Sequence, residues 1–345
     1  WKIPRVTLSF FKQWINNIKF LLFIWLYQYF FLHSRSMSVT KNFYIYLLFI
    51  IVILNSSNLI SDDNTDNLKS RVGTSIEDII ENSILNSVEN IEIDLSGFNK
   101  GKPEIGLSTV APLLENSNSG LFFQGHLSTK NDKEKINLGF AKRNLMHDNK
   151  MVLGYNTFYD HDFSSDHRRW GLGIDIFTSL GDVHVNVYEA MSDGVLNNQG
   201  NTEYVLDGYD YKLGLPIPFL PTSKIYAEAF KWNATMGAKD QKGERFHVKT
   251  KLPYGMNLSF GKTFYSALAQ DQEFIKLSIN LMDLKESKSK PNNKFNSLFS
   301  TNLYSTNFED VSDRKFDKVQ RENDIIIQTV IEDRAITVSI QGYSL

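Results

Sequence analysis

Apolar and polar residues alternate at period two between Met151 and Leu180, on either side of a charged turn. In the second half, the residues on one face are apolar, namely Trp170, Leu172, Ile174 and Ile176. Those on the other face are small or charged, namely Arg169, Gly171, Gly173 and Asp175. A soluble barrel has its apolar face inside, so this inverted arrangement is typical of strands with lipid outside and a polar lumen inside. The pattern predicts an all-β protein, a transmembrane β-barrel.

The same alternation recurs from residue 88 onward in about twelve segments, and each is near the length of a tilted, membrane-crossing strand. The approximate spans are 89–96, 104–112, 120–128, 134–143, 151–161, 168–178, 182–191, 207–216, 223–232, 244–252, 255–265 and 273–282. Lys249, Lys251 and Lys276 occupy alternate positions in these runs. A lysine facing lipid costs about 2–4 kcal/mol at the membrane midplane, so these lysines are expected to face a wet lumen. The even count suits a closed antiparallel barrel, predicted here over 88–282.

The connections between these strands predict the orientation of the barrel. One alternating set is short, with turns near Gly181, at 252–255 and in the proline-rich stretch 216–223. The other set is longer and more polar, at 192–206, 233–243 and 266–272. Outer-membrane barrels have short periplasmic turns and longer extracellular loops. The charged turn between Asp160 and Arg169 is therefore expected outside, and both ends of the barrel in the periplasm.

Residues 1–61 are interpreted as an upstream extension and a secretory signal peptide, with Met37 as the expected start. Lys41, the apolar run 43–54 and the polar stretch after it have the order of such a signal. In residues 62–87, isoleucines and a leucine recur at helical spacing, which predicts a short periplasmic helix before the barrel.

Two motifs resemble a known family. "GYNTFYDHDFSSDHRRWGLG" (Gly154 to Gly173) is similar to the signature hairpin of the inverse autotransporter β-domain, the outer-membrane barrel of intimin and invasin. Far downstream, "RKFDKVQRENDIIIQ" (Arg314 to Gln328) resembles the segment that follows the last strand in that family. The resemblance covers roughly residues 88–333.

The resemblance implies a function for the chain after the barrel. Residues 283–333 would form a periplasmic excursion, a helix near Phe308 to Glu322 and a linker that threads the pore, with Ile325, Ile326, Ile327 and Gln328 inside it. Residues 334–345 would be a truncated or vestigial start of a passenger. The expected function is that of a type V secretion translocator, which anchors and exports a C-terminal segment, in this family an adhesin. The alternative is a passive pore or a structural barrel without a passenger.

The charged hairpin allows three interpretations. A polar network at the lumen and its rim is favoured, formed by Asp160, Asp162, Arg168, Arg169 and Asp175, with Asp160 and Asp175 facing Arg169 across a strand pair. A metal site is the second, because carboxylates and imidazoles are suitable ligands. A rim protease of the omptin type is the third. Adjacent residues of a tight turn do not all converge on one point, so no enzyme activity, catalytic residue or metal is expected.

Composition narrows the remaining classes. The chain has no cysteine, which excludes disulfides, thiolate metal sites and a cysteine nucleophile. Its formal net charge of −2 gives no electrostatic reason to bind nucleic acid. No cofactor and no small-molecule substrate are expected. The expected partners are outer-membrane lipid, the barrel-assembly machinery and periplasmic chaperones, and a homodimer is left open. The expected location is the outer membrane of a Gram-negative bacterium.

Overall fold

A computed structural model describes residues 91–97, 104–130, 133–266, 270–281, 283, 307–331 and 339–341. The chain divides into two units, Trp1–Ser87 and Val88–Leu345, and all described residues lie in the second. The expected signal peptide and the helix over 62–87 lie outside the described residues. Within the described part, no helix is long and apolar enough to cross a membrane.

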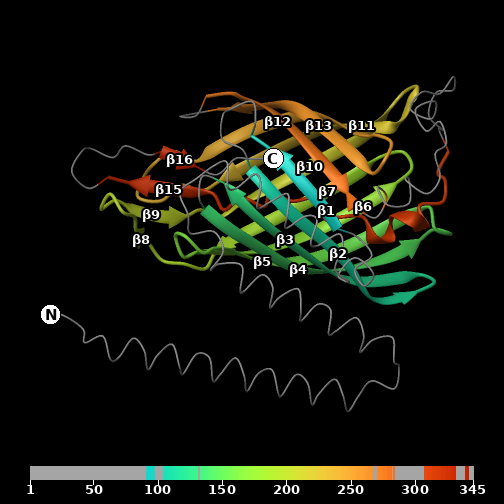
Figure 1. The fold of residues 1–345 in the computed structure, drawn as a ribbon, viewed down its shortest axis with the longest axis horizontal. Helices are drawn as coiled ribbons and strands as arrows, with labels where there is room; N and C mark the ends of the chain where they lie inside the picture. Colours follow the sequence, from blue (N-terminus) through green and yellow to red (C-terminus); the bar gives the residue numbers. More distant parts are fainter. Residues whose placement is uncertain are drawn as a thin grey trace, which may run out of the picture. The chain divides into compact units, whose positions relative to one another are not determined.

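Twelve antiparallel strands form a closed barrel (Figure 1). They are β1 (Ile91–Ser96), β2 (Glu104–Asn116), β3 (Ser119–Lys130), β4 (Lys133–Met146), β5 (Met151–Asp162), β6 (His167–Thr178), β7 (Asp182–Ala190), β10 (Gly208–Ile217), β11 (Leu220–Trp232), β12 (Gln241–Lys251), β13 (Met256–Tyr265) and β14 (Gln272–Asn280). Each strand pairs with the next barrel strand along the chain, β7 with β10, and β1 with β14 to close the ring. The predicted fold, an antiparallel barrel of about twelve strands, is confirmed.

The strands alternate between an apolar outer face and a polar inner face. On β6, Trp170, Leu172 and Ile174 point outward and are 38–47% exposed, whereas Arg169 and Asp175 are fully buried. β7 follows the same rule, with its valines outside and its histidine, asparagine and tyrosine inside. An exposed apolar belt is favourable in lipid, and the buried polar groups lie in the lumen, where side chains satisfy one another.

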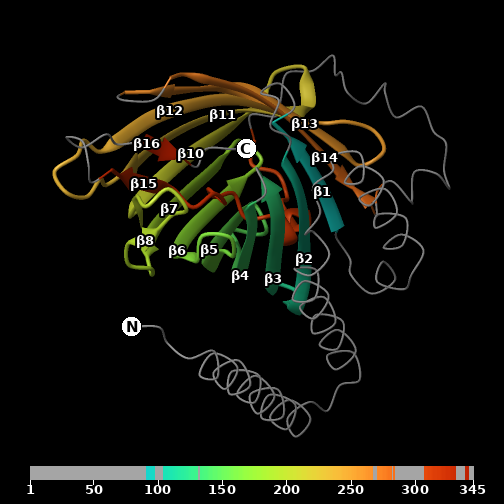
Figure 2. The same cartoon turned by 60° about the vertical axis from the view of Figure 1, so that its left-hand side comes forward.

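A second sheet of four short strands lies at the long-loop end of the barrel. β8 (Val195–Leu196) and β9 (Thr202–Val205) form a hairpin inside the long connection between β7 and β10. β15 (Ile327–Val330) pairs with β9, and β16 (Ser339–Gln341) pairs with β15. This sheet therefore joins the C-terminal part of the chain to a loop of the barrel (Figure 2).

The helix expected near Phe308 to Glu322 is replaced by one short 3-10 helix, η3 (Ser312–Phe316). Barrel side chains bind the backbone groups that an α-helix would use for itself. Gln124 Oε1 accepts a hydrogen bond from the N–H of Val319 at 2.8 Å, and Tyr188 Oη accepts one from the N–H of Glu322, also at 2.8 Å. With these groups already bonded, the chain beyond η3 gains little from coiling.

Candidate functional site: a chain threaded through the lumen

Residues 307–331, here called the threading segment, run through the barrel from end to end. At the short-turn end, Ser179 Oγ donates a hydrogen bond to the carbonyl of Asn307 at 3.2 Å, and the N–H of Val311 donates one to the carbonyl of Asn149 at 2.8 Å. At the long-loop end, the N–H of Leu206 donates to the carbonyl of Ile326 at 2.9 Å. Figures 1 and 2 show the segment in red, leading from η3 inside the barrel to β15.

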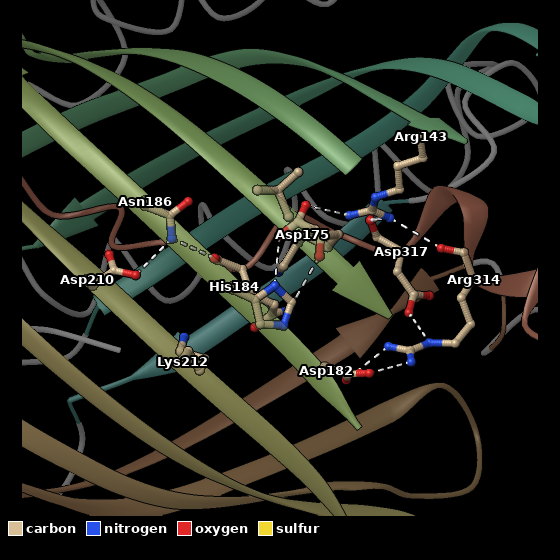
Figure 3. A network of polar contacts seen from close by, with 12 residues as sticks. Arg143, Asp175, Asp182, His184, Asn186, Asp210, Lys212, Arg314 and Asp317 are labelled. Carbon is tan, nitrogen blue, oxygen red and sulfur yellow. Dashed lines mark hydrogen bonds and ion pairs between the residues drawn. The ribbon is translucent and has the colours of Figure 1, made fainter. Parts of the chain in front are cut away.

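Arg314 anchors the segment where it enters the lumen. Its guanidinium binds both carboxylate oxygens of Asp182 on β7, at 2.6 and 3.0 Å, and its Nε donates to Asp317 at 2.9 Å. The guanidinium carbon also lies 4.5 Å from the ring centroid of Phe177. A bidentate arginine–carboxylate pair fixes both distance and orientation, so this contact sets the position of η3 in the barrel (Figure 3).

Arg143 of β4 holds the backbone of the same stretch. It is fully buried, and its Nη1 donates to the carbonyls of Asp317 at 2.5 Å and Arg314 at 3.3 Å. Its Nη2 lies 3.3 Å from Asp175 Oδ2, while the other oxygen of Asp175 lies 2.7 Å from His184 Nδ1. Asp175 is thus occupied by two wall residues and positions the arginine that binds the threading segment (Figure 3).

Asp160 is the centre of the network halfway along the segment. Arg321 of the threading segment donates to both of its carboxylate oxygens, at 2.7 and 2.6 Å. From the wall, Arg169 Nε donates a hydrogen bond to Asp160 at 2.9 Å, and Asn137 Nδ2 donates one to Asp160 at 2.8 Å. Arg169 also donates to the carbonyl of Glu322 at 2.8 Å. None of Asp160, Arg169 and Arg321 is more than 9% exposed, so these charges compensate one another without bulk water.

Further ion pairs follow toward the long-loop end. Glu322 lies 3.3 Å from Arg245 of β12, which in turn binds Glu228 of β11 at 3.1 Å. Asp324 forms an ion pair with Lys135 of β4. The threading segment therefore contacts opposite walls of the lumen through charges of both signs.

The segment leaves the lumen through apolar contacts and a sheet. Ile326 is fully buried in a cluster with Leu206, Tyr188, Phe230 and Trp232. Its neighbours Ile325 and Ile327 pack on Val205 of β9. Gln328 is also buried, and its side-chain amide exchanges hydrogen bonds with the backbone of Thr235, at 2.9 and 3.3 Å. The four residues named from the sequence as a pore linker thus lie at the long-loop end.

Glu203 of β9 supports this exit. Its Oε2 lies 2.8 Å from Nε2 of His167, at the start of β6, and its Oε1 accepts a hydrogen bond from Asn197 at 3.0 Å. Burial by itself would raise the pKa of Glu203, but the hydrogen bonds from Asn197 and His167 outweigh it and hold this pKa below its usual value. The carboxylate is therefore stabilised in its charged form.

The threading segment leaves part of the lumen empty, beside β1 and β12 to β14. A cavity of about 100 Å³ there is lined by residues that include Asp94, Lys249 and Lys276. A second, of about 800 Å³, lies at the short-turn end beside η3 and is lined in part by Lys224 and Tyr226. The larger cavity also reaches Phe177 and Asp182, so open space remains on more than one side of the threading segment.

The structure separates the five residues of the predicted rim network. Asp160 and Arg169 bind each other as expected, but Asp175 lies beside Arg143 and His184 and not beside Arg169. Asp162 accepts hydrogen bonds from the N–H groups of two turn residues, at 2.9 and 3.2 Å. Arg168 lies on the outward face, 3.6 Å from the exposed Asp166. Among the described residues, no three histidine, aspartate or glutamate side chains converge where they could hold a metal ion.

Sequence reasoning missed the partners that the threading segment brings. Arg314, Lys318, Arg321 and Glu322 fall within the helix expected near Phe308 to Glu322, and the sequence indicated no partner for them or for Asp324 and Arg143. The density of charge between residues 313 and 324 was the available signal. A solvated helix carries charge on one face, whereas this run carries it in every direction, as a chain surrounded by polar walls requires.

The chain belongs to the inverse autotransporter β-domain family, whose model matches residues 54–245. It is also similar to the putative attaching and effacing protein homolog of Escherichia coli (strain K12), with 32% identity over 82 residues. That match covers 24% of this chain and only 28% of the relative.

Two solved structures of membrane proteins were found to be similar, and the first shares the fold. A structure from the work "Unveiling the Mechanism Behind the in-meso Crystallization of Membrane Proteins" has a TM-score of 0.57 and 18% identity, and the match covers 70% of this chain and 98% of that one. The KdgM porin has a TM-score of 0.40 and 9% identity, over 55% of this chain and 98% of its own. Family and fold are those of a transport or structural barrel in the outer membrane of Gram-negative bacteria.

Proposed function

We propose that this barrel anchors itself in the outer membrane and passes its C-terminal segment through its own lumen to the cell surface. The observation that supports the proposal is the continuous path of residues 307–331 from the short-turn end to the long-loop end. Short turns of outer-membrane barrels face the periplasm, so the chain beyond β15 would emerge outside. In this role the barrel needs no catalytic residue, and Asp160 is occupied by two arginines.

The contacts of the threading segment also suit a permanent anchor. Asp182, Asp160 and Arg245 each bind a charged residue of the segment in the buried lumen. Each of these wall charges also has a partner in the wall, namely Lys224, Arg169 and Glu228 in that order, so withdrawing the chain would break three of its buried ion pairs without removing every partner. Breaking one buried pair typically costs about 3–5 kcal/mol. Pairing of β15 with β9 adds a backbone contact outside the pore. An exported segment that folds outside would therefore stay attached to the membrane.

Partners of this function follow from the surface of the barrel. The outward apolar side chains would contact lipid, and the barrel-assembly machinery with periplasmic chaperones would deliver and insert the chain.

Surface labelling on intact cells tests the proposal. An epitope appended after Leu345 should bind antibody on whole cells expressing the full chain. Orientation is tested separately with single cysteines, which are unique because the chain has none. An impermeant maleimide should label Gln199→Cys, in the exposed β8–β9 loop, and not Phe308→Cys, at the short-turn end.

The two assays have separate outcomes. Labelled Gln199→Cys together with an epitope detected only in lysed cells would contradict export while keeping the orientation. The protein would then be a pore or structural barrel, to which the cavities beside β1 and β12 to β14 would lend support.

A further inference from the structure

The barrel closes at a short seam between β1 and β14. These strands pair over five positions, from Glu92 opposite Asn280 to Ser96 opposite Lys276. By contrast, β5 and β6 pair over twelve. Within the described residues, no other neighbouring pair of barrel strands has fewer paired positions than this seam. Ladder hydrogen bonds alone therefore hold the seam less firmly than the rest of the wall.

Asp94 of β1 connects the two sides of the seam from within the lumen. Its Oδ1 accepts a hydrogen bond from Ser278 of β14 at 2.6 Å, and its Oδ2 lies 3.2 Å from the ammonium of Lys276 on the same strand. On its other side, Ser108 of β2 donates to Asp94 at 3.2 Å and lies 2.8 Å from His126 of β3. Asp94 is 5% exposed, so these contacts act away from bulk water.

The threading segment supplies a further contact to this cluster. Lys318 Nζ lies 3.4 Å from Asp94 Oδ2 and 3.3 Å from Glu92 Oε1. The next residue, Val319, is fixed by its backbone hydrogen bond to Gln124 of β3. Lys318 is thus presented to the seam by a chain already docked on β3, two strands from β1.

We propose that Lys318 locks the β1–β14 seam through Glu92 and Asp94, so that the chain passing through the barrel completes its closure. Glu92 and Asp94 are two positions apart on β1 and point to the same lumen. Like charges this close repel each other, and of the two carboxylates Lys276 forms an ion pair with Asp94, while the charge of Lys249 acts on Glu92. Among the described residues, Lys318 is the ammonium that forms an ion pair with both carboxylates, so it contributes directly to relieving their repulsion at the seam.

The proposal is tested by Lys318→Met in the full chain, measured as the temperature at which the folded barrel loses its fast electrophoretic migration. We expect this temperature to fall by about 2–8 °C. The matched control is Lys315→Met in the same segment. Lys315 binds Glu115 and the carbonyl of Asn116, at the end of β2 away from the seam.

A disulfide across the seam separates a loosened seam from a general loss of stability. Leu95 and Leu277 are directly paired, and they alternate with the lumen residues, so Leu95→Cys with Leu277→Cys can bridge β1 and β14 outside the cluster. The oxidised bridge should restore the conversion temperature of Lys318→Met, and it should not restore any loss in Lys315→Met.

A double variant gives a second, independent measurement. Asp94→Asn should lower the conversion temperature, and Lys318→Met should add less on that background than it does alone. An unchanged temperature for Lys318→Met, a loss that the oxidised bridge leaves in place, or additive effects with Asp94→Asn would each overturn the seam lock. Surface exposure of the C-terminal epitope is a separate readout, so export can be retained even if the lock fails.

Discussion

At the scale of single residues, the lumen is organised by charges that the wall does not fully neutralise by itself. Asp160 binds Arg169 across a strand pair and also receives Arg321 from the threading segment. Close contact of the segment with β6 depends on the lack of a side chain at Gly171. A Cβ atom there would lie 3.2 Å from Arg321 Nη2 and 3.3 Å from the ring of Tyr188. The wall is therefore shaped around the chain as well as charged for it.

Replacing Asp160 by alanine should be much more damaging than replacing an exposed acid of the same hairpin. Asp160→Ala leaves two buried arginines without their carboxylate, and we expect a loss of about 3–5 kcal/mol in the free energy of unfolding. Asp166→Ala removes exposed contacts to Arg168 and His161 and should change it by no more than about 1 kcal/mol. Urea unfolding of the two purified barrels measures the difference. Equal stability would mean that Asp160 is dispensable to the network.

At the scale of elements, the sequence predicted the barrel strands well and the threaded chain poorly. The spans 151–161 and 168–178 agree with β5 and β6 to within a residue, because alternation between lipid and lumen is local and repeats along each strand. The state of residues 308–322 depends on Gln124, Arg143 and Tyr188, which lie far away in sequence. Apolar spacing alone predicted a helix there, and distant side chains determined otherwise.

The β8–β9 hairpin was missed for a similar reason. Its strands are two and four residues long, too short for a periodic signal, and β9 gains a second neighbour only when β15 arrives from the C-terminal part of the chain. Of the site residues, Asp160 and Arg169 could be paired from strand register, as could Asp175 and His184, whereas Arg143, the other partner of Asp175, could not. Arg143 reaches Asp175 across β5, and register with the next strand does not reveal a contact two strands away.

The outward face of β6 should not tolerate a charge. Ile174 is 47% exposed on the apolar side, and Ile174→Lys should reduce the stability of the barrel in lipid by up to about 2–4 kcal/mol, the cost of a lysine at the membrane midplane. Phe163→Lys is the matched control, because Phe163 is similarly exposed at 43% but lies in the turn after β5. Folding into lipid vesicles across a urea series compares the two. An equal loss for both variants would contradict the facing of β6.

The four-stranded sheet of β8, β9, β15 and β16 should become less stable in acid. The pKa of Glu203 lies below its usual value of about 4.5 because the hydrogen bonds from Asn197 and His167 outweigh burial, so its charged form stabilises the sheet above that pH. This stabilisation is lost as the pH falls below about 4.5 through the folded-state pKa. Hydrogen exchange of β9 and β15 amides, corrected for intrinsic rates, should therefore accelerate more in the wild type than in Glu203→Gln. The same acid response in both proteins would exclude Glu203 as the cause.

At the scale of the whole molecule, the threading segment contacts the barrel wall and occupies part of the lumen, and in the proposed function it also leads the exported chain outside. It contacts the wall from β3 to β12 and leaves cavities of about 100 and 800 Å³ beside it. The smaller cavity is lined in part by Lys318, Arg321 and Glu322 of the segment. Ion flow through the intact barrel should therefore be small, and it should be limited by this segment and not by the barrel wall.

Planar-bilayer conductance of the refolded barrel measures this directly. Residues 62–345 should give a nearly closed channel, whereas a chain ending at Met282 lacks the threading segment and should conduct through the full width of a twelve-stranded barrel. Phe308→Ala in the longer chain is the control, because Phe308 is 54% exposed at the short-turn end and its loss should leave the channel closed. Equal, large conductance of the longer and the shorter chain would mean that residues 307–331 leave the lumen in a bilayer. The protein would then be interpreted as a passive pore and not as an exporter. If the proposal is right, the channel formed by residues 62–345 is nearly closed and opens only when the threading segment is removed, because this segment blocks the lumen.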